Sequence, residues 1–274
     1  MTRMRGWVKP DSMSMVFVLL SVIILFFIFA PLVKTVGSSA PGVLWNTLLE
    51  GEVYSSILLT IYAALVATLV GLFLGVPLAY LLARRRFWGK RFLEGLIDIP
   101  IVMPHSAVGI ALLFVFGSNF LMGKLLNSMG IGFVDRLSAV VIAMMFVSIP
   151  FLIDSAKEAF NAVDVRLEKV ARTLGASPWR SFCRISLPLA WRGIFSGSVL
   201  MWARGFSEFG AIYVVAGHVP FLGYHPVAAP ILVTELFESP GGLRAAQPLT
   251  VLLILICLVV FIVLRTIAYG GAKA

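Results

Sequence analysis

The stretch LEKVARTLGASPWRSFCRISLP, Leu167–Pro188, is polar and basic, whereas the chain around it is almost wholly apolar. Apolar residues recur at helical spacing over Val163–Leu174, which predicts a helix. Gly175 is expected to end it, because glycine adopts the left-handed C-cap conformation without steric cost. The Ser177–Pro178 pair then predicts the start of a second helix, with serine as N-cap and proline in the first turn. The segment is therefore predicted to form a helix, a sharp corner and a second helix that leads into the next apolar run.

The spacing of this insert leaves two interpretations open. A second protein binds it, or it is a solvated hairpin with no partner, since helix–turn–helix patterns are common.

The composition of the chain is typical of an integral membrane protein. Of 274 residues, 60% are hydrophobic and 13% are charged, and the mean hydropathy is +1.00; soluble domains are about half apolar and about a quarter charged. The net charge of +9 does not indicate nucleic-acid binding, because the basic residues cluster between apolar runs, as topology signals do. Cys183 and Cys257 are too few for a disulfide framework, and no Cys/His cluster has metal-ligand spacing, so we expect no metal site.

Apolar runs long enough to cross a bilayer, about 20 residues, occur six times. The first run is too long for the core of a signal peptide and has no Ala-x-Ala site before its end, which predicts a retained helix. The predicted spans are Met13–Val33, Tyr54–Ala83, Ile99–Gly117, Leu137–Ile153, Ile194–Ala216 and Ala246–Leu264.

The positions of the basic residues predict the orientation. If the N-terminus is inside, most of the 22 Lys and Arg residues lie in inner segments, as the positive-inside rule requires. We therefore expect a multi-pass protein of the cell (plasma or inner) membrane, with both termini and the insert in the cytoplasm. The inner basic residues are Arg3, Arg5, Lys9, Arg84, Arg85, Arg86, Lys90, Arg91, Lys157, Arg166, Lys169, Arg172, Arg180, Arg184, Arg192, Arg265 and Lys273.

Small residues repeat every four positions along the second span, which predicts a closely packed helix interface. The repeat does not say whether that interface lies within one chain or between two. The stripe is Ala63, Ala67, Gly71, Gly75 and Ala79, and Gly193, Gly197 and Gly205 begin a similar one in the fifth span.

The third span contains Pro100 and Pro104 beside His105. Proline removes a backbone donor and kinks a helix, and the freed carbonyls at that depth face protein or a water-filled cavity. This span is therefore a candidate for lining a pathway, although for His105 itself we favour a hydrogen bond to a neighbour.

Arg204 and Glu208 lie four residues apart in the fifth span, on one helical face. Charge inside a membrane is costly, so the two are expected to neutralise each other. The pair braces a helix beside the permeation path, or it is a static ion pair that joins two helices; both interpretations stay open.

The outer segment 217–245 is long and rich in proline. Leu232–Phe237 is apolar enough to lie against the bundle as a short helix. Three interpretations of the segment stay open: it caps an outer gate, it receives a binding protein, or it is a plain loop. The roles of His218 and His225 also stay open.

The insert resembles the cytoplasmic "EAA" loop of ABC-importer permeases, which reads roughly E-A-A-x3-G-x9-I-x-L-P. Gly175 is followed by nine residues and then Ile185–Pro188, and Ala171 occupies the last Ala position. Lys169 and Val170 replace the Glu and the first Ala, while Glu168 is one position early.

Two further stretches narrow the resemblance. DIPIVMPHSAVGIALLFVFG, Asp98–Gly117, and WARGFSEFGA, Trp202–Ala211, look like permeases for tetrahedral oxyanions, above all the molybdate/tungstate type and next the sulfate type. The resemblance extends over most of residues 54–265.

The resemblance implies an all-α membrane protein of the type I ABC-importer architecture, with six-helix subunits that work as a homodimer. Residues 1–274 would form one permease domain with its core at 54–265 and a cytoplasmic coupling loop at 156–190. The implied partners are a dimer of ATPase subunits, a second copy of the chain, an extracytoplasmic oxyanion-binding protein and the bilayer, with no nucleic acid. The implied coupling residues are Val163, Leu167, Glu168, Val170, Ala171, Arg172, Thr173, Leu174 and Gly175. The implied pathway and gate residues are Pro104, Ser106, Gly109, Arg204, Ser207 and Glu208.

The sequence has no G-x4-G-K-[ST] phosphate loop, so an ATP-driven transporter built on this chain needs ATP and Mg²⁺ on another subunit. We therefore expect neither a cofactor nor catalysis in this chain. A sulfate/thiosulfate permease is the neighbouring alternative. A stand-alone secondary transporter would need intramembrane titratable residues, and only Glu208 and His105 qualify. An intramembrane enzyme would need a catalytic constellation, which is not evident.

Overall fold

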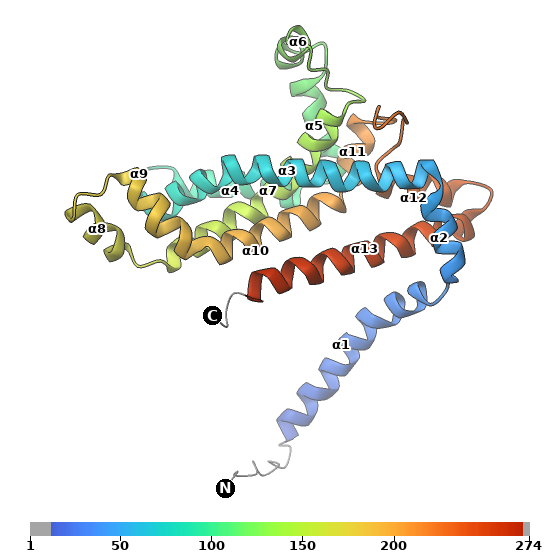
Figure 1. Ribbon diagram of the computed structural model, residues 1–274, viewed down its shortest axis with the longest axis horizontal. Helices are drawn as coiled ribbons and strands as arrows, with labels where there is room; N and C mark the ends of the chain where they lie inside the picture. Colours follow the sequence, from blue (N-terminus) through green and yellow to red (C-terminus); the bar gives the residue numbers. More distant parts are fainter. Residues whose placement is uncertain (1–11, 271–274) are drawn as a thin grey trace.

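The computed structural model describes residues 12–270, and this part of the chain is helical apart from turns and one isolated bridge between Phe221 and Tyr224 (Figure 1). The expected all-α class is confirmed. The helices are α1 (Ser12–Val36), α2 (Pro41–Leu49), α3 (Gly51–Arg84), α4 (Lys90–Val102), α5 (His105–Phe116), α6 (Leu121–Ser128), α7 (Leu137–Ala162), α8 (Val165–Thr173), α9 (Pro178–Ser181), α10 (Leu187–Phe206), α11 (Gly210–Val215), α12 (Ala229–Glu238) and α13 (Gly242–Gly270), with a π-helical turn at Phe182–Ser186 between α9 and α10.

Four of the described helices, α1, α3, α7 and α13, are long and apolar enough to cross a membrane. They contain the expected first, second, fourth and sixth spans. The pair α4–α5 makes a fifth if it is counted as one bent span. The chain is therefore integral to a membrane. The tail residues behind the predicted cytoplasmic termini, Arg3, Arg5, Lys9 and Lys273, lie outside the described residues.

The predicted third span is wrong as a single helix. Its residues belong to α4 and α5, which are bent by 116° at a break before His105. Met103 is extended and Pro104 is the N-cap of α5. Proline has no N–H to continue a helix and disfavours helical geometry in the residue before it, which explains the break.

The predicted fifth span is also interrupted. α10 ends at Phe206, the chain turns over Ser207–Phe209, and α11 starts at Gly210. α10 is 20 residues long but is not among the four apolar spans, because its two arginines lower its hydropathy. Two short helices that the sequence did not predict, α2 and α6, also occur.

The small-residue stripe packs inside this chain, which answers a question that the sequence left open. All five stripe residues of α3 are buried, and α3, α7 and α10 pack against one another. A Cβ on Gly71 would overlap Met201 of α10, and one on Gly197 would lie 2.6 Å from Ser155 Cβ of α7. The glycines thus permit close helix approach in the centre of the bundle.

The two ends of the bundle differ (Figure 1). One end has α8 and α9 beside the C-terminal end of α3, and the other has α2 and α12. The predicted short outer helix is confirmed as α12, and the backbone N–H of Ala229 donates to Thr60 Oγ1 of α3 at 2.8 Å. α1 leans away from the bundle, and none of its residues is buried.

Candidate functional site

The α8 helix begins and ends as local sequence rules require. Asp164 is its N-cap and accepts the backbone N–H of Arg166 at 2.9 Å. Val163, which was expected inside the helix, is extended and buried just before it. The start of the predicted helix therefore moves by two residues.

The predicted stop at Gly175 is confirmed. Gly175 has φ +88°, and its N–H donates to Arg172 O at 3.1 Å while the N–H of Ala176 donates to Ala171 O at 3.0 Å. These two bonds are a Schellman motif, which satisfies carbonyls at the end of the helix and requires the left-handed residue that glycine supplies.

The predicted second helix is confirmed as well. Ser177 Oγ accepts the backbone N–H of Arg180 at 3.2 Å, and Pro178 occupies the first helical position. The helix continues through the π-helical turn at Phe182–Ser186 into α10, and the residues at both junctions keep helical backbone dihedrals. The corner is thus continuous with a helix of the bundle.

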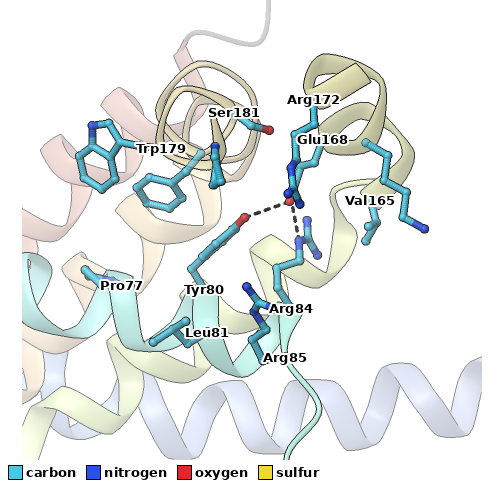
Figure 2. Close-up of a pocket in the computed structure, with 13 residues that line it drawn as sticks. Pro77, Tyr80, Leu81, Arg84, Arg85, Val165, Glu168, Arg172, Trp179 and Ser181 are labelled. Carbon is cyan, nitrogen blue, oxygen red and sulfur yellow. Dashed lines mark hydrogen bonds and ion pairs between the residues drawn. The ribbon is translucent and has the colours of Figure 1, made fainter. Parts of the chain in front are cut away.

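Glu168 fastens α8 to α3 (Figure 2). Its Oε1 accepts from Arg84 Nε at 2.7 Å and its Oε2 accepts from the Tyr80 hydroxyl at 2.9 Å. Arg84 Nη2 also donates to Val163 O at 3.0 Å. Since both side chains of the ion pair are about nine-tenths buried, the contact is shielded from water.

The surroundings of Glu168 favour its ionised form. Burial by itself raises the pKa of the carboxyl group. The nearby Ser186 hydroxyl, Arg84 and Tyr80 lower it by more than burial raises it, so the pKa lies below the ordinary value of a glutamate. The carboxylate is therefore charged at neutral pH, as an ion pair with Arg84 requires.

The expected coupling residues lie on different sides of the segment 163–175, of which α8 is the helical part. Val163 and Glu168 face inward and are buried. Leu167, Val170 and Leu174 are exposed and share one face by their spacing of three and four residues, with Leu174 83% exposed. α8 therefore presents an apolar face to its surroundings while a charged face holds it to the bundle.

The expected ion pair between Arg204 and Glu208 is confirmed, with Arg204 Nη2 donating to Glu208 Oε2 at 2.9 Å. The two residues do not share a helix, because α10 ends between them. The other oxygen of Glu208, Oε1, accepts the backbone N–H of Ala211 at 2.9 Å in the first turn of α11. Glu208 is 1% exposed, so this carboxylate both neutralises an arginine and supports the turn that interrupts the span.

His105 joins this pair from α5. Its ring nitrogens lie 3.1 Å from Arg204 Nη2, and its Nδ1 lies 3.4 Å from Glu208 Oε2. The favoured interpretation of His105 as hydrogen-bonded to a neighbour is confirmed. The structure thus brings the start of α5 to the end of α10, although 99 positions separate His105 from Arg204.

The other expected pathway residues are divided between surface and packing positions. Pro104, Ser106 and Ser207 are exposed near the His105 contact. Gly109 is buried, and a Cβ there would lie 2.6 Å from Val214 Cβ of α11. Gly109 therefore permits the close packing of α5 on α11 and does not face an open space.

Sequence reasoning missed Arg84 and Tyr80 as the partners of Glu168. Arg84 belongs to the run Arg84–Arg86, which was interpreted only as a topology signal. The available signal was that Tyr80 and Arg84 are four residues apart, and so share a face at the end of a long helix.

Residues 75–270 match the family described as "Binding-protein-dependent transport system inner membrane component". The molybdate/tungstate transport system permease protein WtpB of Pyrococcus furiosus is 44% identical over 231 residues, which cover 84% of each chain. The WtpB of Methanocaldococcus jannaschii is 40% identical over 245 residues, 89% of this chain and 92% of that protein. A chain from the crystal structure of a bacterial ABC transporter involved in the import of the acidic polysaccharide alginate has the same fold, with a TM-score of 0.72, 16% identity, and coverage of 94% of this chain and 96% of that one.

Proposed function

The chain belongs to the family of inner membrane components of binding-protein-dependent transport systems, and from this premise we propose that it is the permease subunit of an ATP-driven ABC importer for molybdate or tungstate. The family gives the class of protein. The names of the relatives that cover most of the chain support the substrate.

One observation carries the proposal: α8 is rigidly held on one face and apolar and exposed on another. The Glu168–Arg84 ion pair holds the helix to α3. Leu167, Val170 and Leu174 remain exposed. An apolar patch that is exposed to water on a protein surface typically marks a site where a partner binds. A separate ATPase subunit that provides ATP and Mg²⁺ is the proposed occupant, and this chain itself is not an enzyme.

The contacts of α8 suggest how force from the ATPase reaches the bundle. α7 leads into α8, α9 leads out of it towards α10, and Arg84 connects it laterally to α3. A displacement of α8 on nucleotide-driven closure would therefore move three helices of the central packing unit together. Because packed helices shift as rigid elements, the movement would reach the far end of the bundle.

The substrate path is proposed to pass the cluster of His105, Arg204 and Glu208. Arg204 is already paired with Glu208 at a distance of 2.9 Å. A tight oxyanion site requires converging unpaired donors, so this cluster would pass the anion weakly. Selectivity would then belong to an extracytoplasmic binding protein that docks at the end with α2 and α12.

Assembly and orientation complete the proposal. We propose that the protein lies in the cell (plasma or inner) membrane with the α8–α9 end and both termini on the cytoplasmic side. In this arrangement α10 is an additional span that completes the six helices of each subunit. A second copy of the chain would cover apolar surface that one chain leaves exposed, such as that of α1.

The test is reconstitution of the full chain with its ATPase in proteoliposomes. ATP hydrolysis should be stimulated by binding protein loaded with molybdate or tungstate, and radiolabelled tungstate should accumulate inside only with ATP. Stimulation by sulfate alone would reassign the substrate. Uptake that is independent of any ATPase would contradict the importer itself.

A further inference from the structure

A groove of about 600 Å³ lies between the end of α3 and the α8–α9 corner (Figure 2). It is separate from the apolar face of α8, because Glu168, Lys169 and Arg172 line it, whereas Leu167, Val170 and Leu174 are not among its lining residues. The proposed coupling uses the Glu168–Arg84 ion pair at the edge of this groove, but it leaves the rest of the lining without a role.

The groove has an excess of positive charge. Arg84 is already paired with Glu168. Arg85, Lys169 and Arg172 also line the groove, and the ion pairs found among residues 12–270 do not include them. Three basic residues therefore line one cavity without an ion-pair partner among the described residues.

One wall of the groove is apolar. Pro77 and Leu81 come from α3, a membrane-spanning helix, and Trp179 comes from α9. Leu81 is 50% and Trp179 73% exposed. A small hydrated oxyanion gains nothing from contact with an apolar wall, whereas the acyl chain of an amphiphile would bury its apolar surface there. Such a chain would enter the groove from the bilayer around α3.

A buried hydroxyl completes the site. Ser181 lines the groove and is 2% exposed, and its Oγ has no hydrogen-bond partner in the protein. Buried hydroxyls without a partner are uncommon, since each costs about 1–3 kcal/mol. A ligand that presents acceptor oxygens at this wall would satisfy Ser181.

We propose that this groove binds an anionic phospholipid, with its phosphate among Arg85, Lys169 and Arg172 and an acyl chain along Leu81 and Trp179. Basic pockets at the cytoplasmic ends of membrane helices recognise anionic headgroups by this combination. The bound lipid would bridge α3 and α8 beside the Glu168–Arg84 ion pair. The proposal goes beyond transport and requires only that the chain is embedded in a membrane.

Trp179 provides the readout. The full chain in phosphatidylcholine nanodiscs is titrated with phosphatidylglycerol brominated on its acyl chains, and the contribution of Trp179 is isolated by difference from W179F, because the chain has six tryptophans. Quenching of Trp179 should saturate at a low mole fraction of phosphatidylglycerol. Equal quenching by brominated phosphatidylcholine would overturn the proposal.

Two variants and one control sharpen the test. R85Q/K169Q/R172Q should raise the half-saturating mole fraction roughly tenfold or more, since each basic residue near an anionic headgroup strengthens binding several-fold. S181A, which removes a hydroxyl that has no protein partner, should raise it several-fold without unfolding the chain. The matched control R166Q/R180Q/R184Q removes the same charge outside the groove and should leave it unchanged. An equal effect of the control, or displacement of the lipid by millimolar inorganic phosphate or molybdate, would overturn the proposal.

Discussion

Arg84 Nε lies 2.7 Å from Glu168 Oε1, which joins the end of the long α3 helix to α8 across 84 positions of sequence. The pair is nearly buried, and Tyr80 donates a second hydrogen bond to the same carboxylate. Because Arg84 also donates to Val163 O, it holds the residue that leads into α8. The position of α8 on the bundle therefore depends on this contact.

Replacing Glu168 with alanine should destabilise the packing of α8 by about 3 kcal/mol, because removal of one partner leaves the buried Arg84 without a counter-charge. The change is measured as local opening of α8 by hydrogen exchange in the full chain. Glu158→Ala, at an exposed position near the end of α7, is the matched control. Equal protection of α8 in the E168A variant and the wild type would contradict the bracing role.

The stability of this contact should depend on pH with a definite sign. The pKa of Glu168 in the folded chain is lower than that of a free glutamate, which is about 4.3. The ionised carboxylate therefore contributes its full stabilisation of the folded chain above about pH 4.3. This stabilisation is lost as the pH falls through the lowered folded pKa. Hydrogen-exchange opening of α8 should therefore increase below about pH 4, and E168Q should abolish this dependence. An unchanged pH profile in E168Q would assign the effect to another group.

Aspartate at Val170 and Leu174 should prevent ATPase binding while the fold is kept, because both side chains are exposed and lack core contacts. We expect at least a tenfold loss of co-purified ATPase and an unchanged melting temperature. Leu222→Asp combined with Leu243→Asp, which places the same two charges at positions 64% and 69% exposed in the 217–245 segment, is the control. Loss of the ATPase in the control as well would point to a general effect of charge.

Variants of Arg204 and Glu208 distinguish a purely structural role of this ion pair from a role in conduction of the anion. Glu208→Leu alone should destabilise the chain by about 3 kcal/mol, because it leaves Arg204 without its partner and α11 without the hydrogen bond to Ala211. The double variant R204M/E208L should regain much of that stability, and we expect its tungstate uptake to fall at least tenfold. Thermal unfolding and uptake are measured on the same preparations. Uptake at the wild-type level would reduce the pair to a static connection.

Glycines should be essential for stability at the positions where two helices of the bundle pack closely. Gly197→Val should destabilise the chain by about 1–3 kcal/mol, because the new side chain would collide with Ser155 of α7. Gly95, in α4, has open space around its Cβ direction and serves as the control, with Gly95→Ala expected to be neutral or slightly stabilising. Melting temperatures in one detergent decide between them; equal values for both variants would contradict close packing at Gly197.

The sequence by itself determined the elements that depend on neighbouring residues. Long apolar runs became membrane-length helices because burial of backbone polar groups in lipid leaves a single segment no alternative to a helix. The stop at Gly175 and the start at Ser177 followed from backbone geometry and capping, which act over a few positions.

Only the tertiary structure decided which distant groups meet. The partners of Glu168, the contact of His105 with Arg204, and the choice of an intrachain partner for the α3 stripe all join residues far apart in the chain. The break at Ser207, where hydrophobicity alone predicted a continuous span, was also visible only in the structure, whereas the break before His105 follows from the local geometry of Pro104. The physical reason is that apolarity and capping are properties of a local segment, whereas a buried charge selects its partner from whatever the packed helices bring within hydrogen-bonding distance.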